Sequence, residues 1–161
     1  MASLWHERNV VTLGKDLVSD TTSETLSAVA DGAGYDSTTF LVKLGDVDAA
    51  AVLTFAVKEN TASSTSSPSP TAVTLDRITS SVSGVITSGN VVLTESSGNL
   101  DDKIILITVK HSGQSKRYVF LSITATVESY EVDFIGIIQS DARVEPVTQS
   151  SDVVASASLA K

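Results

Sequence analysis

Alternation of apolar and polar positions is the clearest structural signal in this sequence. Two apolar runs, Ile104–Val109 and Tyr118–Ile123, flank the polar segment His111–Ser115. Both runs are rich in Ile, Val, Phe and Tyr, which suit a pleated, half-buried surface. The glycine-containing connector predicts a β-hairpin with a longer loop. The first run is apolar on both faces, so we expect this hairpin to form the middle of a sheet.

Further strands are predicted on both sides of this pair. Thr38–Gly45 and Ala51–Glu59 alternate and have an acidic turn between them, which predicts a second hairpin. We expect their inward residues to be Phe40, Val42 and Leu44, and Leu53, Phe55 and Val57. The other expected strands are Glu24–Ala30, Ala72–Asp76, Val82–Thr87, Val91–Thr94 and Val132–Gln139. Gly136 indicates a bulge or a close backbone approach, and a helix over Thr22–Ala30 is the alternative to the first strand.

Many short strands separated by turn residues predict an all-β protein. We expect an antiparallel β-sandwich, jelly-roll-like, with extended N- and C-terminal arms. The predicted organisation is an N-terminal arm (1–23), one sandwich domain (24–145) and a flexible C-terminal tail (146–161). Within the domain, the Ser/Thr/Pro-rich segment Asn60–Pro70 is expected to be an exposed loop.

The N-terminal segment supplies the candidate binding residues. It mixes apolar and polar residues without steady periodicity, which is typical of a loosely ordered terminus or of an arm that packs on a neighbour. Trp is the residue most enriched at binding hot spots. The expected partner-binding residues are Leu4, Trp5, Val10, Val11 and Leu13.

Composition and charge narrow the function classes. Only 5% of residues are aromatic and 19% are charged, while Ser, Thr and Val are frequent, which is common in β-rich structural proteins. A net charge of −8 without a Lys/Arg run argues against nucleic-acid binding. No apolar stretch approaches the length of about 18 residues that predicts a membrane span. Cysteine is absent, and the N-terminus lacks the pattern of a secretory signal, so we expect synthesis in a cytoplasm.

Candidate chemistry is sparse. His6 and His111 lie in predicted flexible or turn segments, and both are expected to be solvated. Asp31–Asp36 lacks the alternating carboxylates of a calcium loop, and turn chemistry accounts for the acidic pairs Asp46/Asp48 and Asp101/Asp102. The carboxylate pair of a glycoside hydrolase is defined by a spatial separation that a sequence does not give. We therefore expect no catalytic, cofactor-binding or metal-binding residues, no cofactor and no enzyme activity.

Three short sequence elements, in this order along the chain, resemble those of a known protein family. Gly34–Ser37 leads into Phe40 in a GYDS-x-T-F element, Thr54–Glu59 reads TF-x-V-x-E, and Lys116–Leu121 reads KRYV-x-L. From Gly34 to about Arg143 the sequence resembles small tailed-bacteriophage virion proteins, the capsid decoration (cement) proteins. This family has no catalytic motif, so no functional residue can be transferred.

The resemblance implies a structural protein of the virion that binds the outside of an assembled capsid and stabilises it. The expected partners are the major capsid protein of the same virion and copies of the chain itself, as a dimer or trimer on capsid symmetry axes. Neither nucleic acid nor membrane is an expected partner. The alternative is another virion part, such as a tail-tube, tail-terminator or head–tail connector subunit. A carbohydrate-binding, adhesin-like module is a minor alternative, because few aromatic residues are available to stack on sugars, and a small hydrolase is the least favoured.

Overall fold

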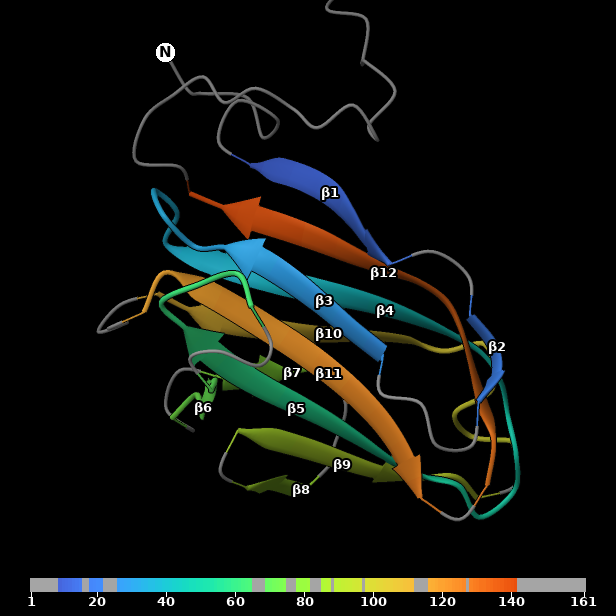
Figure 1. Ribbon diagram of the computed structural model, residues 1–161. Coiled ribbons are helices and arrows are strands. Elements are labelled where there is room, and N and C mark those ends of the chain that lie inside the picture. Colours follow the sequence, from blue (N-terminus) through green and yellow to red (C-terminus); the bar gives the residue numbers. More distant parts are fainter. Residues whose placement is uncertain are drawn as a thin grey trace, which may run out of the picture.

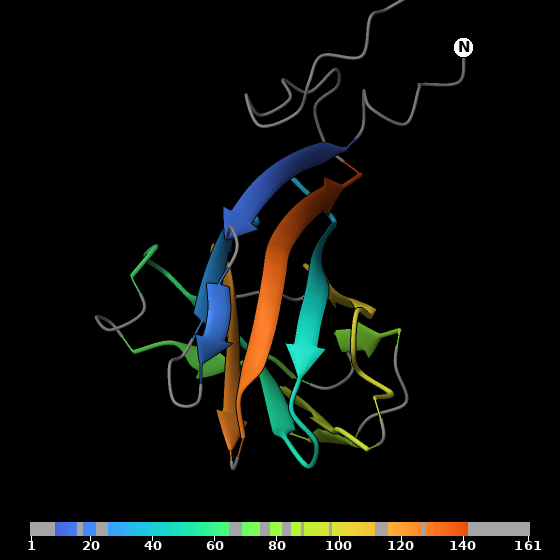
Figure 2. The same ribbon diagram turned by 90° about the vertical axis from the view of Figure 1, so that its right-hand side faces the viewer.

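The protein consists of two β-sheets packed face to face (Figures 1 and 2). The computed structural model describes residues 9–15, 18–21, 26–64, 69–74, 78–81, 85–87, 89–96, 98–111, 116–126 and 128–141. Within these residues the regular secondary structure consists of β-strands alone, and every strand pairing is antiparallel. The predicted all-β sandwich is confirmed.

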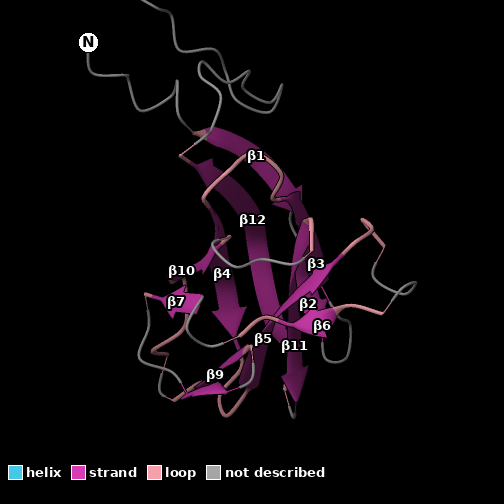
Figure 3. Ribbon diagram, turned by 90° about the vertical axis from the view of Figure 1, so that its left-hand side faces the viewer, coloured by secondary structure: helices cyan, strands magenta, loops and turns pink. Residues whose placement is uncertain are grey.

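Each sheet has six strands. In spatial order, sheet A contains β1 (Val10–Lys15), β12 (Tyr130–Ser140), β4 (Ser37–Val47), β10 (Ile104–Lys110) and β7 (Ile78–Ser80), with β2 (Val18–Thr21) also paired to β12. Sheet B contains β3 (Leu26–Asp31), β11 (Tyr118–Thr126), β5 (Val52–Asn60), β9 (Asn90–Thr94) and β8 (Val85–Thr87), with β6 (Thr71–Ala72) beside β5. Figure 3 shows the long strands β4 and β12 side by side in sheet A.

The pairing of the longer strands is that of a jelly roll. The first of them, β1, pairs with the last, β12, and β3 pairs with β11. Then β4 pairs with β10, and β5 pairs with β9. Two further pairings, β12 with β4 and β11 with β5, join these pairs into the two sheets. These four nested strand pairs, divided between two sheets, are the topology of the jelly rolls of capsid and lectin domains.

One core fills the space between the sheets. The inward residues predicted for Thr38–Gly45 and Ala51–Glu59 are all buried, with Phe40 and Phe55 completely so. The inward residues of β10 and β11 are buried opposite them, and Tyr130 donates its hydroxyl hydrogen to the Ile123 carbonyl oxygen at 3.1 Å. Each buried large apolar side chain contributes about 1.5–3 kcal/mol relative to exposure, so closing the sandwich dominates the stability.

Both predicted hairpins are wrong. Ile104–Val109 belongs to sheet A and Tyr118–Ile123 to sheet B, so they face each other across the core and are not hydrogen-bonded neighbours. The same holds for Thr38–Gly45 in β4 and Ala51–Glu59 in β5. A turn between two alternating strands serves a hairpin and a crossing between sheets equally well, because the inward residues face the core in both.

The expected N-terminal arm is partly wrong as well. Residues 10–15 and 18–21 form β1 and β2, which pair with β12 inside the same chain. Gly14 allows this edge to lie close to the other sheet, since a Cβ there would be 2.8 Å from Ile137 Cδ1 and 3.1 Å from Ala28 Cβ. The rest of the arm, residues 1–8, and the tail 146–161 lie outside the described residues.

Several smaller predictions are also refined. Towards β4 the register of β12 shifts between Tyr130 and Phe134, and Gly136 pairs regularly with Leu41. Towards β1 the register shifts beside Gly136, because the irregularity in β1 lies between Leu13, its partner, and Lys15. Of the expected strand Ala72–Asp76, Ala72 lies in β6, Val73 and Thr74 lie outside any strand, and residues 75–76 are not among the described residues. The strand Ile78–Ser80 was not predicted, and Leu26–Asp31 is a strand and not a helix.

A buried carboxylate shapes the turn that follows β9. Glu95 is 2% exposed, and its side-chain oxygens accept hydrogen bonds from the amides of Asn99 at 3.0 Å and Leu100 at 2.6 Å. The Glu95 amide donates to the Ala51 carbonyl oxygen at 2.8 Å. Hydrogen bonds to charged groups are the stronger ones, so Glu95 fixes the path by which the chain leaves sheet B and enters β10 of sheet A.

Two glycines with positive φ provide a matched test of the fold. At Gly89 (φ +80°) a Cβ would lie 2.8 Å from the Val57 carbonyl oxygen, whereas at Gly34 (φ +87°) nothing lies within 4 Å. We expect Gly34→Ala to lower the free energy of unfolding by about 1–2 kcal/mol through backbone strain alone. Gly89→Ala should lower the free energy of unfolding by at least about 1 kcal/mol more than Gly34→Ala does, because its methyl group would clash with backbone atoms. Urea unfolding of both variants measures the difference, and equal losses would contradict the placement of Gly89.

Candidate interaction face

The outer face of sheet A carries a continuous apolar surface. Gly136 of β12 lies between Leu13 of β1 and Leu41 of β4, and Leu41 lies beside Leu106 of β10. Directly paired residues point to the same side of a sheet, so the flanking rows can be read from the same register. The apolar residues of this face are Val11, Leu13, Leu41, Ile104, Leu106, Phe134 and Ile138.

Three of these side chains are the most exposed large apolar groups among the described side chains of sheet A. Ile104 is 55% exposed, Leu13 45% and Leu106 38%, and the other four are half-buried. The both-sided apolar pattern of Ile104–Val109 was expected to place this strand in the middle of a sheet, and β10 does lie between β4 and β7. In the structure the core covers its inner side, and its outer side is open. Large apolar patches rimmed by polar residues mark interaction sites.

The polar groups on this face already have partners within the chain. Lys43 Nζ donates to the Leu44 carbonyl oxygen at 2.6 Å, and it lies 2.8 Å from Asp102 Oδ1 and 3.1 Å from Asp133 Oδ2. An ammonium group has three donors, so each has an acceptor. These carboxylates raise the pKa of Lys43 and, in return, Lys43 lowers the pKa of Asp102. Thr39 and Thr108 share a hydrogen bond of 2.8 Å between their hydroxyl groups.

The outer face of sheet B is different. Its paired positions are largely small and polar, with Ser27 and Ser122 hydroxyl groups 3.4 Å apart. Two large aromatic residues lie there, Tyr118, which is half-buried, and Phe120, which is only 1% exposed. In Figure 1 the described part of the chain directly after β5 passes over this side of the sandwich. Val29, 42% exposed, is its most exposed large apolar residue. Among the described residues, the broad apolar surface is therefore on sheet A.

The structure separates the predicted partner-binding residues. Val11 and Leu13 point outward on the apolar face, whereas Val10 points inward and is buried. Leu4 and Trp5 lie outside the described residues. Sequence reasoning missed Leu41, Ile104, Leu106, Phe134 and Ile138 as binding candidates. The sequence did carry a signal for them, because each is an apolar residue at an outward position of a strand that otherwise alternates between apolar and polar residues.

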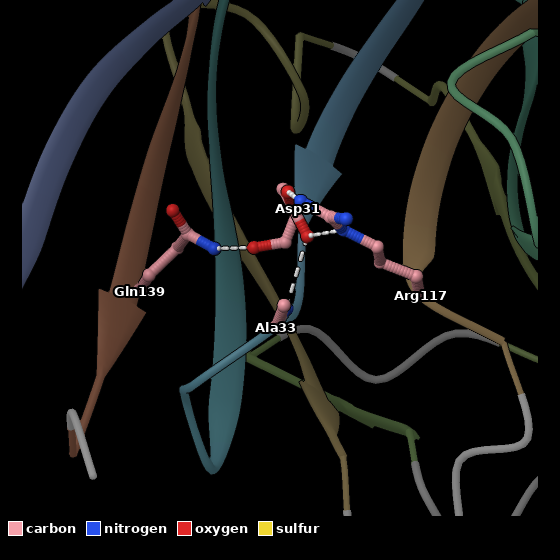
Figure 4. Close-up of polar contacts among 4 residues, drawn as sticks. All are labelled: Asp31, Ala33, Arg117 and Gln139. Carbon is pink, nitrogen blue, oxygen red and sulfur yellow. Dashed lines mark hydrogen bonds and ion pairs between the residues drawn. The ribbon is translucent and has the colours of Figure 1, made fainter. Parts of the chain in front are cut away.

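A polar junction ties the two sheets together at one end (Figure 4). Asp31, at the end of β3, receives hydrogen bonds from Arg117 Nε at 2.8 Å and from Arg117 Nη2 at 2.5 Å. The Ala33 amide also donates to the Asp31 carboxylate at 3.1 Å. Gln139 of β12 in sheet A donates to the Asp31 carbonyl oxygen. The Arg117 guanidinium holds the pKa of Asp31 below its ordinary value.

The expectation that His111 is a solvated surface residue is wrong. His111 is 5% exposed, and its Nε2 lies 2.8 Å from the Thr38 hydroxyl group. The residue continues the inward alternation of Ile107 and Val109, which was the missed signal. Thr38 is fully buried, so a substrate could not reach its hydroxyl and this pair serves packing. His6 lies outside the described residues.

A small acidic hollow lies at the opposite end. It has a volume of about 390 Å³ and is lined by Asp46, Asp48, Ser129, Tyr130 and Glu131. Within the described part of the chain, no group of three or more His, Cys, Asp or Glu residues is arranged to hold a metal ion. The same part contains no helix that could cross a membrane.

No protein-family model matches this chain, and no curated protein matches it. Inference about function must therefore start from the fold and from the surfaces described above.

The Asp31–Arg117 pair predicts a pH dependence of stability. The pKa of Asp31 is lowered in the folded protein from 3.8, so the pair stabilises the fold above that pH, and the stabilisation is lost as the pH falls through the folded-state pKa. Because the pair is partly exposed, Asp31→Asn should lose no more than about 1 kcal/mol at neutral pH. Arg117→Gln and the double variant complete a thermodynamic cycle. An equal deficit of Asp31→Asn at pH 7 and at strongly acidic pH would contradict this role.

Proposed function

We propose that this chain is a structural protein of a tailed-phage virion that binds the outer surface of the assembled capsid and stabilises it. The observation that carries the proposal is a jelly roll with a broad apolar outer surface on sheet A, which is suited to contacts with other protein. Such a body suits attachment to a large assembled surface, and binding to the assembled state stabilises that state by linkage. The proposed partners are the major capsid protein and further copies of this chain, and the proposed location is the capsid exterior.

The segments that carry the family resemblance support the proposal by their positions. The TF-x-V-x-E element lies in β5 and the KRYV-x-L element leads into β11, and these strands are hydrogen-bonded neighbours in sheet B. Phe55 pairs with Ile123 and Val57 pairs with Leu121. The GYDS-x-T-F element leads into β4, whose Phe40 is buried on the other side of the core. The resembling segments thus contribute two neighbouring strands of sheet B and one strand of sheet A to the same core.

The charge of the chain is compatible with this role. A net charge of −8 keeps a protein soluble at high copy number and repels it from packaged DNA. Nothing in the described residues forms a basic stripe that could follow a phosphate backbone. The acidic charge therefore favours contact with protein, and we propose neither nucleic acid nor membrane as a partner.

The decisive test is the location of the chain in a virion. In cryo-EM maps of particles from a phage whose genome encodes it, we expect the jelly roll on the outer capsid surface. The purified chain, added to capsids that lack it, should bind and raise the temperature at which they open. A position in the tail, or rings or tubes formed by the purified chain alone, would overturn the proposal in favour of a tail or connector role.

The predicted anchor residues Leu4 and Trp5 give a second test. We expect Leu4→Ala/Trp5→Ala to lower capsid occupancy at least about tenfold, the effect of losing one hot-spot aromatic residue. The melting temperature should not change. Ser3→Ala/His6→Ala is the matched control and should bind normally. Full occupancy of the Leu4/Trp5 variant, measured by co-sedimentation with capsids, would show that these residues do not anchor the chain.

A further inference from the structure

We infer that the outer face of sheet A is the surface through which two copies of this chain associate, face to face about a two-fold axis. The inference deepens the proposed function by assigning a surface to self-association, and its test needs no capsid. The face comprises the central outward positions of β1, β12, β4 and β10, which are the seven apolar residues described above together with Gly136, Thr39, Lys43 and Thr108.

The polar groups of this face are arranged so that it can lose water. Burying a donor without a partner is costly, but each donor of Lys43 already faces an acceptor in the same chain. The hydroxyl groups of Thr39 and Thr108 bond to each other. A second copy could therefore cover the face without leaving these groups unpaired.

The charge distribution favours a second copy as the occupant. The whole chain carries a charge of −8, so two copies repel each other over most of their surfaces. In the middle of this face the cation Lys43 is matched by Asp102 and Asp133, and the charged outward residue of β10, Lys110, lies at the end of the strand, beyond Thr108. A strongly basic partner would instead be drawn to acidic surfaces such as the hollow near Asp46 and Glu131.

The shape of the face suits packing against itself. Gly136 leaves a low point between Leu13 and Leu41, and no atom lies closer than 3.8 Å to the position where its Cβ would be. Ile104 and Leu106 project at one side of this low point, on β10. A two-fold axis uses the same patch on both partners, so projections on one copy can meet the low point of the other.

The size of the face predicts a weak dimer. Strands lie about 4.8 Å apart and successive outward residues about 6.8 Å apart, so four strands with three outward positions cover roughly 400 Å². Standard-size interfaces bury about 800 Å² on each partner. The dimer should therefore dissociate on dilution and become favourable where copies are held close together on a surface.

Sedimentation velocity of the full chain over a wide range of concentrations tests the inference. We expect a reversible monomer–dimer equilibrium, and Leu106→Lys should raise the dimer dissociation constant at least about tenfold, because the dimer buries two copies of the charge. Val29→Lys, on the outer face of sheet B, is the matched control and should dimerise normally. Circular dichroism melting checks that both variants fold, and Leu106→Thr is the milder second variant.

The outcomes separate the dimer from the capsid role. A wild-type chain that stays monomeric at every concentration overturns the inference. Dimerisation lost in Val29→Lys but kept in Leu106→Lys also overturns it. If the chain is monomeric and Leu106→Lys fails to bind capsids, the face serves the capsid protein, and the proposed function stands without the dimer. If removal of residues 142–161 raises dimerisation and the Leu106 dependence persists, the C-terminal segment is the occupant of the face in the full chain, and this outcome also overturns the inference.

Discussion

The structure depends on the packing of two sheets against one shared core. Strands that follow each other along the chain, β4 and β5 or β10 and β11, lie in opposite sheets and bury their inward side chains against each other. Without the other sheet, the inward side chains of either sheet would be exposed to water. The Glu95 turn and the Asp31 junction act at crossings or ends of the sandwich, where they hold one sheet in place over the other.

Much of the fold could be predicted because strand alternation is a local signal. The inward positions of β4, β5 and β11 follow from a period of two, and so does the sandwich as a class. Which strands pair could not be predicted locally. The predicted turn Gly45–Asp48 has the composition of a hairpin turn, yet β4 continues to Val47 and the chain crosses to the other sheet over residues 48–51. Hydrogen-bonding partners such as β1 and β12 lie far apart in sequence. The strand β1 was missed because its outward residues Val11 and Leu13 are apolar, which obscures the alternation.

The candidate face illustrates a different limit. From the sequence alone, apolar residues at outward positions look the same as core residues. Leu106 was therefore interpreted as part of a strand in the middle of a sheet, and Leu41 was not singled out. Register alone shows that they share a row with Gly136 and Leu13. His111 gave the opposite error, because a titratable residue next to a polar loop was taken as solvated. Its position one step beyond Val109 on the inward side decides its burial.

The pairing of β1 with β12 bears on how the protein forms during synthesis. The strand made first needs a partner that ends at Ser140, so sheet A is incomplete on the ribosome until almost all of the sandwich sequence has emerged. Pairings this distant in sequence are slow, because loop-closure entropy is lost before contacts form. Until then the unpaired strand edges and apolar side chains are open to other chains. Conditions that keep nascent chains apart during this interval should therefore favour correct folding over association between chains.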